Sequence, residues 1–231
     1  CHAAWHPHIE KTKSFIRDAA SKVEQHKKVV ILGAGILSDI PIDTLSAKFE
    51  SVHLVDVCFL KKTQKHVSLR SNINFQTFDI TDFAVPLYKW VTGNQSIEGF
   101  PTPALPESFN LSETDLVISS NLLSQLPLIP AQFLRNKIPN IDEGVIVEFS
   151  QRILSAHLEY LNSCPGTVCL ISEVEREIHD GQKNLIIQDP LWGQSIGRDG
   201  EEWLWDVVPK SEISNNYEIR NSVIGAHWNP S

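Results

Sequence analysis

The sequence predicts an α/β protein built on a mostly parallel sheet, and two observations lead to this fold class. From Lys28 to Cys169, short aliphatic and β-branched runs alternate with longer stretches of helical periodicity, which is the pattern of repeated strand–helix units. After Glu177 the pattern changes to short hairpin-like runs, which predict antiparallel strands at the edge of the sheet. A chain of 231 residues with 42% hydrophobic residues is long enough to bury a substantial core, and we expect a single domain.

The expected elements follow one another in a regular order. Parallel strands are expected at 28–32, 52–57, 73–78, 115–119 and 167–173. Helices are expected from Pro41, over 59–67 and over 142–163, with a loop at 92–107 that is rich in Gly, Pro and Ser. Antiparallel strands are expected at 185–188, 203–208 and 217–226.

The charge and the cysteine content exclude several classes of function. The formal net charge of −8 argues against a protein that grips nucleic acid through its phosphates. No run approaches the roughly eighteen apolar residues of a membrane span. The four cysteines form no CxxC pair and no metal-ligand spacing with histidine, so no metal site is expected. Cys58 and Cys169 lie in apolar runs and are expected to be reduced, buried thiols, which predicts a cytoplasmic protein.

Small and acidic residues stand where the first three strands end. Gly33 and Gly35 follow the first strand, where the missing side chains let a ligand approach the backbone. Asp56 ends the second strand, at the place where an acid can accept hydrogen bonds from ribose hydroxyls. Asp79 and Ile80 follow the third strand and can bind and cover an adenine. Together these residues predict a nucleoside site. In the alternative interpretation the glycines make a tight turn and the two acids cap the following helices.

Several nucleotide-binding motifs are missing. A dinucleotide fingerprint requires glycine at position 38, where this chain has Ser38. A short-chain dehydrogenase requires a tyrosine four residues before a lysine, and no tyrosine of the chain meets that spacing. The chain also lacks a phosphate-binding loop that ends in Gly-Lys-Ser/Thr. An NAD(P)-dependent oxidoreductase is therefore the least favoured of the nucleotide-binding alternatives.

Four motifs resemble those of the class I S-adenosylmethionine-dependent methyltransferases, and more closely those of its uncharacterised bacterial members. They are LGAG at 32–35, LVDV at 54–57, FDIT at 78–81 and DLVISSNLLSQLP at 115–127. The resemblance spans about 28–175. It implies a three-layer Rossmann-like methyltransferase fold, with a mostly parallel seven-stranded sheet and a C-terminal antiparallel hairpin. It divides the chain into an N-terminal helical cap at 1–27, a cofactor-binding core at 28–177 and antiparallel strands at 178–231.

The resemblance implies S-adenosylmethionine as the cofactor and a small molecule or protein as the methyl acceptor. The cofactor-binding residues that it implies are Gly33, Ala34, Gly35, Asp56, Val57, Asp79, Ile80, Ser119 and Ser120. The chain departs from the family pattern at Ile31, where an acid is usual, and at Leu37, where a glycine is usual. These departures favour an alternative function, a degenerate member that binds the cofactor weakly or not at all and acts through protein contacts.

Candidates for contact with the methyl acceptor come from two segments. Asn121 and Gln125 follow the fourth strand, although they can equally be a helix cap and an exposed polar side chain. Trp5 and His6 belong to an N-terminal segment that, in the family, often folds over the acceptor pocket. His6 or His8 can then act as a base, and a surface pair of histidines is the alternative. The catalytic residues are not identified by the sequence.

Overall fold

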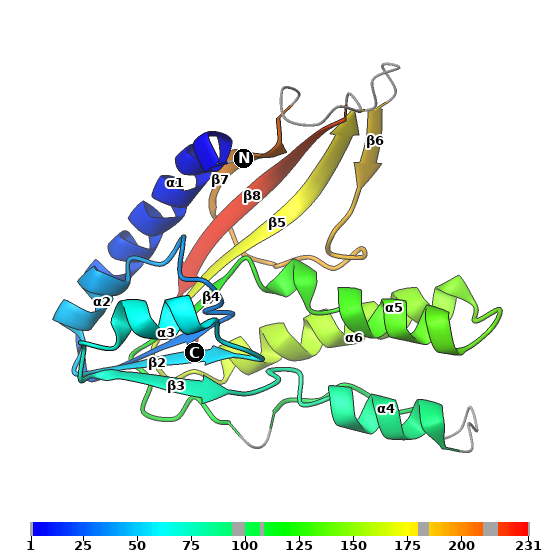
Figure 1. Cartoon of the computed structure of the whole chain (residues 1–231), viewed down its shortest axis with the longest axis horizontal. Helices are drawn as coiled ribbons and strands as arrows, with labels where there is room; N and C mark the ends of the chain where they lie inside the picture. The colour runs from blue at the N-terminus through cyan, green and yellow to red at the C-terminus, as the bar shows by residue number, and fades with distance from the viewer. Residues whose placement is uncertain (1, 94–99, 107–108, 180–184, 210–216, 231) are drawn as a thin grey trace.

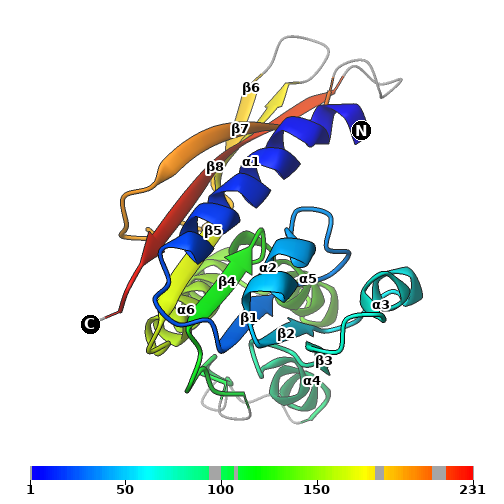
Figure 2. The same ribbon diagram turned by 90° about the vertical axis from the view of Figure 1, so that its left-hand side faces the viewer.

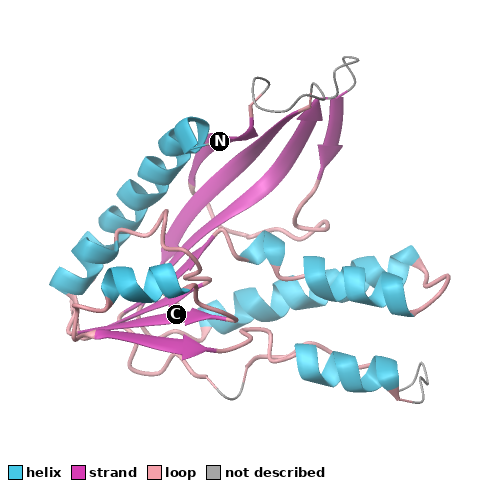
Figure 3. Cartoon of the chain, viewed as in Figure 1, coloured by secondary structure: helices cyan, strands magenta, loops and turns pink. Residues whose placement is uncertain are grey.

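The structure is a computed structural model that describes residues 2–93, 100–106, 109–179, 185–209 and 217–230. Its centre is one sheet with the strand order β3-β2-β1-β4-β5-β8-β7, to which β6 is added by pairing with β5. Helices lie on both faces of this sheet, so the chain forms three layers (Figure 3).

The parallel half of the sheet contains the first five strands. Their bounds are β1 Lys28–Leu32, β2 Ser51–Asp56, β3 Ile73–Thr77, β4 Leu116–Ser120 and β5 Thr167–His179. β1 pairs in parallel with β2 on one side and with β4 on the other. Every residue of β4 is buried, as expected for a strand covered on both faces.

The antiparallel half of the sheet follows β5. Its strands are β6 Leu185–Gln188, β7 Glu201–Val208 and β8 Glu218–Trp228. β8 pairs antiparallel with β5 and with β7. β5 continues well past the end of β4, where its last residues pair with β6. The sheet therefore has eight strands, one more than the resemblance implies, because β6 forms its own pair with the long β5.

The helices separate into two groups. Those packed on one face of the sheet are α1 His2–Ser21, α2 Ile42–Lys48 and α3 Lys61–Val67. The second group is α4 Ala84–Thr92, the 3-10 turn η2 Leu123–Gln125, α5 Leu128–Lys137 and α6 Glu143–Asn162. α6 covers the opposite face of the sheet, while α4 and α5 lie beyond the arrowheads of β2 and β3 (Figure 1). α1 runs alongside β7 and β8 in both views (Figure 2).

The sequence explains where α6 begins. The side chain of Asp142 accepts a 2.7 Å hydrogen bond from the Gly144 N–H, and an acid at this position also interacts favourably with the helix dipole. Phe149 and Ile153, which lie on one side of the helix, are buried. The predicted helix at 142–163 is thereby confirmed.

These elements confirm the predicted fold class. The order 3-2-1-4-5 of the parallel strands is that of a Rossmann sheet, and β8 and β7 supply the expected antiparallel end. One expectation within the fold is wrong: Cys58 is exposed, because β2 ends at Asp56 and the chain then leaves the sheet. Cys164 and Cys169 are buried, and burial raises the pKa of the Cys169 thiol to about 12.

Candidate functional site

The candidate site lies where the strand order reverses. β1 has β2 on one side and β4 on the other, so the chain leaves β1 and β4 in opposite directions at their carboxyl ends. In open parallel sheets this switch point is where ligands bind. The Gly33–Gly35 turn follows β1 and Asn121 follows β4, so both reach this edge.

The glycine turn is held against the end of β2. The N–H groups of Gly33 and Ala34 donate to the carbonyl of Val55, at 3.0 and 3.2 Å. Gly33 and Gly35 have φ values of +72° and +37°, in the region that glycine adopts without the steric penalty of a Cβ atom. The two glycines are thus required by the shape of the turn itself.

Asp56 closes over this turn. Its Oδ2 accepts a 2.8 Å hydrogen bond from the Gly35 N–H, and its Oδ1 accepts a 3.2 Å bond from the Cys58 N–H. Each carboxylate oxygen can accept more than one hydrogen bond, and Asp56 is only half-buried. The carboxylate therefore still has acceptor capacity for a ligand hydroxyl. The adjacent Val57 is exposed.

Asp79 is engaged in shaping the chain before α4. Its Oδ1 accepts from both the N–H and the hydroxyl of Thr81, at 3.0 and 2.6 Å. Its Oδ2 accepts a 3.0 Å bond from the Ala84 N–H at the start of α4. This is the helix-cap role that the sequence offered as the alternative. Ile80 is buried in the core below the sheet.

The two serines at the end of β4 face opposite sides of the sheet. Ser119 is fully buried, and its hydroxyl lies 3.0 Å from Nε2 of His157 on α6. Its side chain therefore belongs to the core rather than to the edge. The Ser120 hydroxyl donates to Oδ2 of Asp39 at 3.0 Å, on the side that faces the glycine turn and α1.

Asp39, Ser120, Asn121 and His8 form a polar cluster, which we name the Asp39 cluster. Asp39 Oδ2 accepts a 2.8 Å hydrogen bond from the side-chain amide of Asn121. The same amide nitrogen lies 3.2 Å from His8 Nε2. Asn121 has φ +50°, a left-handed conformation that asparagine tolerates better than most residues. Its Oδ1 is buried, with almost no accessible surface, and has no hydrogen-bond partner.

His8 connects the Asp39 cluster to the C-terminal strands. Its Nδ1 accepts a 3.0 Å hydrogen bond from the indole N–H of Trp203 on β7. Its ring stacks on that of Trp205, with centroids 4.1 Å apart and an interplanar angle of 8°. His8 is 2% exposed, and burial lowers its pKa to about 4. The ring is therefore neutral at pH 7. Because Nδ1 accepts from Trp203, Nε2 carries the proton, so Nε2 and the Asn121 amide nitrogen are two donors in contact and form no hydrogen bond with each other.

The remaining acceptor-contact candidates lie around this cluster without entering it. The Trp5 indole N–H donates to the Val207 carbonyl at 2.8 Å, and this bond anchors α1 to β7. His6 is exposed. Gln125 is also exposed, and its amide donates back to the Asn121 carbonyl at 2.5 Å. The N-terminal helix thus covers the Asp39 cluster through His8, and Trp203 and Trp205 form the packing around it.

Sequence reasoning missed Asp39. A signal for it was present, because Asp39 is the acid in the otherwise largely apolar run from Ile36 to Ile40, six residues after Gly33. The dinucleotide fingerprint tests position 38 and does not include position 39. Asp39 and Asn121 are 82 residues apart, and local sequence patterns carry no information on such a contact.

Space at the glycine turn differs between its two glycines. Outside its chain neighbours, a Cβ atom at Gly35 would have no atom nearer than 3.7 Å, so the turn is open to a ligand there. A Cβ atom at Gly33 would lie 3.1 Å from the Cβ of Leu122, so Leu122 covers that glycine. The residues present therefore fit an adenosine at Gly35 and Asp56, and they leave less room beside Gly33.

Within the described ranges, no three His, Cys, Asp or Glu side chains come together in a way that could hold a metal ion. No helix in the described part of the chain is both long and apolar enough to cross a membrane.

The strand order 3-2-1-4-5, with β8 and β7 as its antiparallel end, is that of a Rossmann-like sheet, as the resemblance to the class I S-adenosylmethionine-dependent methyltransferases implies. No protein-family model and no curated protein sequence matches the chain. Among solved structures, the chain is similar to the N-methyltransferase NodS from Bradyrhizobium japonicum, with a TM-score of 0.44, 11% identity and 96% of each chain covered. It is also similar to 1,6-didemethyltoxoflavin-N1-methyltransferase from Burkholderia thailandensis, with a TM-score of 0.42, 10% identity, and 96% of this chain and 84% of that one covered.

Proposed function

We propose that this chain binds S-adenosylmethionine at the switch point and transfers its methyl group to a small-molecule or protein acceptor. The observation that carries the proposal is the convergence of the Gly33–Gly35 turn, Asp56 and the Asp39 cluster on one edge of the sheet. A glycine turn lets a ligand approach the backbone, and an acid at the end of the second strand suits ribose hydroxyls. In this proposal Asp79 and Ile80 lie at the adenine end of the cofactor.

When bound, S-adenosylmethionine supplies an activated methyl group, so the chain mainly has to orient the acceptor and exclude water. Asn121, at the carboxyl end of β4, is the candidate for contact with the methyl acceptor, and its buried Oδ1 has to be uncovered before it can accept a hydrogen bond from that molecule. Asp39 keeps the Asn121 amide fixed through its 2.8 Å hydrogen bond. α1 covers the cluster and shields it from water, because His8 on α1 is buried.

A second candidate function is favoured by Leu122. This side chain covers Gly33, with its Cδ1 3.2 Å from where a glycine Cβ would lie. A ligand that approaches the backbone at Gly33 has to displace it. If Leu122 stays in place, the chain is a degenerate methyltransferase-fold protein that binds the cofactor weakly and acts through protein contacts.

Calorimetry with S-adenosylhomocysteine and with NAD⁺ tests the proposal. We expect saturable binding of S-adenosylhomocysteine and no measurable heat from NAD⁺. Gly35→Ala should weaken this binding at least about tenfold, because its methyl group enters the open space beside Asp56. Gly197→Ala is the matched control: Gly197 also has a positive φ, of +64°, and open space around it, but it lies in the loop before β7.

Binding of NAD⁺ without S-adenosylhomocysteine would reject the cofactor assignment. No measurable binding heat with either ligand would favour the degenerate alternative. A Leu122→Ala variant then separates the two cases, because removing the covering side chain should restore binding if the glycine turn is otherwise intact.

A further inference from the structure

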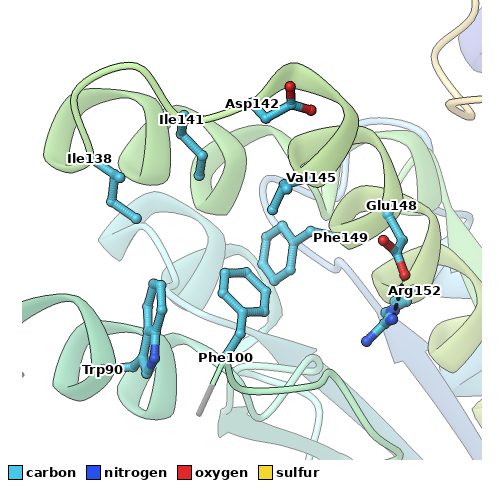
Figure 4. Close-up of a pocket in the computed structure, with 9 residues that line it drawn as sticks. All are labelled: Trp90, Phe100, Ile138, Ile141, Asp142, Val145, Glu148, Phe149 and Arg152. Carbon is cyan, nitrogen blue, oxygen red and sulfur yellow. Dashed lines mark hydrogen bonds and ion pairs between the residues drawn. The ribbon is translucent and has the colours of Figure 1, made fainter. Parts of the chain in front are cut away.

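A second cavity lies outside the strand-end site, among the helices that extend beyond the sheet. It has a volume of about 600 Å³, within the range of about 300–1,000 Å³ that is typical of small-molecule sites. Its walls come from α4, from Phe100 in the loop that follows it, from the end of α5 and its connection to α6, and from the first half of α6 (Figure 4). No residue of the glycine turn or of the Asp39 cluster lines it.

Three aromatic rings form one side of this cavity. The ring centroids of Trp90 and Phe100 are 4.8 Å apart at 75°, and those of Phe100 and Phe149 are 5.4 Å apart at 88°. Phe149 is 1% exposed and also packs against Phe83, at 5.3 Å. Edge-to-face contacts of this kind stabilise ring positions. The aromatic side is thus held in place by contacts within the chain.

The other walls of the cavity are aliphatic. Ile138 stands at the end of α5, Ile141 in the connection, and Val145 in the first turns of α6. Val145 is 41% exposed. Native interiors are closely packed and contain few voids larger than a water molecule. A cavity of this size with six apolar lining residues therefore exposes surface that a bound apolar molecule would cover.

The charged residues of the lining have partners within the chain. Glu148 and Arg152 form an ion pair with each other across one turn of α6. Asp142 accepts the Gly144 N–H at the N-terminus of the same helix, where the helix dipole favours a negative charge. A ligand therefore needs no charge of its own, and a charged group would compete with these contacts.

We infer that this cavity binds a neutral aromatic small molecule of about two or three rings. The inference is independent of the proposed methyl transfer, because the two sites share no residue. Apolar area supplies the affinity, and the three rings select a flat ligand over an aliphatic chain.

N-phenyl-1-naphthylamine is a suitable probe, because it is neutral and becomes fluorescent in apolar surroundings. Its fluorescence should rise to saturation at one molecule per chain. 1-Anilinonaphthalene-8-sulfonate has the same ring system with an added sulfonate. It should bind at least about tenfold more weakly, since Arg152, the cation of the lining, is already paired with Glu148 and the desolvation of the sulfonate is not offset. Equal or tighter binding of the sulfonate would overturn the neutral-ligand assignment.

Val145→Trp places a large side chain in the cavity. It should weaken the binding of N-phenyl-1-naphthylamine at least about tenfold. Val147→Trp is the matched control, because Val147 is 37% exposed on the same helix and does not line the cavity. Unchanged binding in Val145→Trp, or equal losses in both variants, would overturn the proposal.

A measurement on the unmutated chain does not depend on whether a variant folds. With isotope-labelled isoleucine methyl groups, titration of the probe should shift the NMR signals of Ile138 and Ile141 and leave that of Ile31, in the sheet core, in place. Shifts spread over the whole chain would overturn the proposal. So would a solution mass of two copies that Val145→Trp reduces to one, because the cavity would then be a contact between copies.

Discussion

Leu37 adopts a left-handed backbone conformation, which is usual for glycine. It has φ +58° at the position where the family resemblance implies glycine. A left-handed conformation costs a non-glycine residue roughly 1–2 kcal/mol, and full burial of a leucine side chain contributes about 1.5–3 kcal/mol. Leu37 is 7% exposed and packs in the core beneath α1 and α2. The substitution thus preserves the turn, and its side chain serves the core.

Asp56→Ala should weaken the binding of S-adenosylhomocysteine by roughly 2–4 kcal/mol, which is about 30- to 1,000-fold, through the loss of two hydrogen bonds to a charged group. Isothermal calorimetry measures this change. Asp43→Ala is the control, because Asp43 pairs with Arg70 on the surface and should leave affinity unchanged. If Asp56→Ala lowers the free energy of unfolding and leaves the affinity for S-adenosylhomocysteine unchanged, Asp56 only stabilises the glycine turn.

The backbone of Gly166, just before β5, lies against the backbone of the residues just before β4. A Cβ atom at Gly166 would lie 2.3 Å from the Asp115 carbonyl oxygen and 2.4 Å from that of Thr114. The next residue, Thr167, donates its N–H to the same Asp115 carbonyl at 2.9 Å. Only glycine at position 166 allows β5 to start beside β4 in this register.

Gly166→Ala should therefore lower the free energy of unfolding by roughly 1–3 kcal/mol, as backbone has to shift to relieve the contact. Urea unfolding followed by circular dichroism measures the change. Gly197→Ala carries the cost of a positive φ without any close contact, so it should cost less. An equal loss in both variants would mean that β5 tolerates a shifted start.

Buried histidines lie on both faces of the molecule. His8 on α1 is buried against Trp203 of β7 on one side of the sheet, and His157 on α6 lies against Ser119 on the other. Burial lowers the pKa of each to about 4. The sheet runs without interruption from β3 to β7 between these faces, and we propose on this ground that the chain folds as a single domain.

Acid should therefore destabilise the whole molecule. An unfolded histidine titrates near pH 6.5, so the unfolded chain binds protons before the folded one does. The stability that the neutral histidines contribute is complete above about pH 6.5 and is lost as the pH falls toward 4. When the pH falls from about 7 to about 4.5, each of these histidines should lower the free energy of unfolding by roughly 2–3 kcal/mol.

Urea unfolding at these two pH values measures the effect. His8→Gln should reduce the difference by roughly 2–3 kcal/mol, because glutamine does not titrate. His6→Gln, two residues away on the exposed side of α1, should leave it unchanged. Equal pH dependence in the His8→Gln variant would show that His8 is accessible to protons in the folded chain.

The local sequence was sufficient to predict the alternating strands and helices. β1 at Lys28–Leu32 and β6 at Leu185–Gln188 have the predicted bounds, because short apolar runs between turn residues read directly as strands. The residues that follow such strands, Gly33, Gly35 and Asp56, were located for the same reason: a parallel strand delivers the next residues to the carboxyl edge. Their proposed contacts with a cofactor stay predictions.

Only the tertiary structure brought Asp39, Asn121 and His8 together, across separations of 82 and 113 residues. It also decided that α4 and α5 extend beyond the sheet and leave a cavity beside α6. The sequence predicted neither, because strand and helix signals depend on neighbours within a few residues. The distance between two elements depends instead on how their buried faces pack, and that packing is a property of the whole chain.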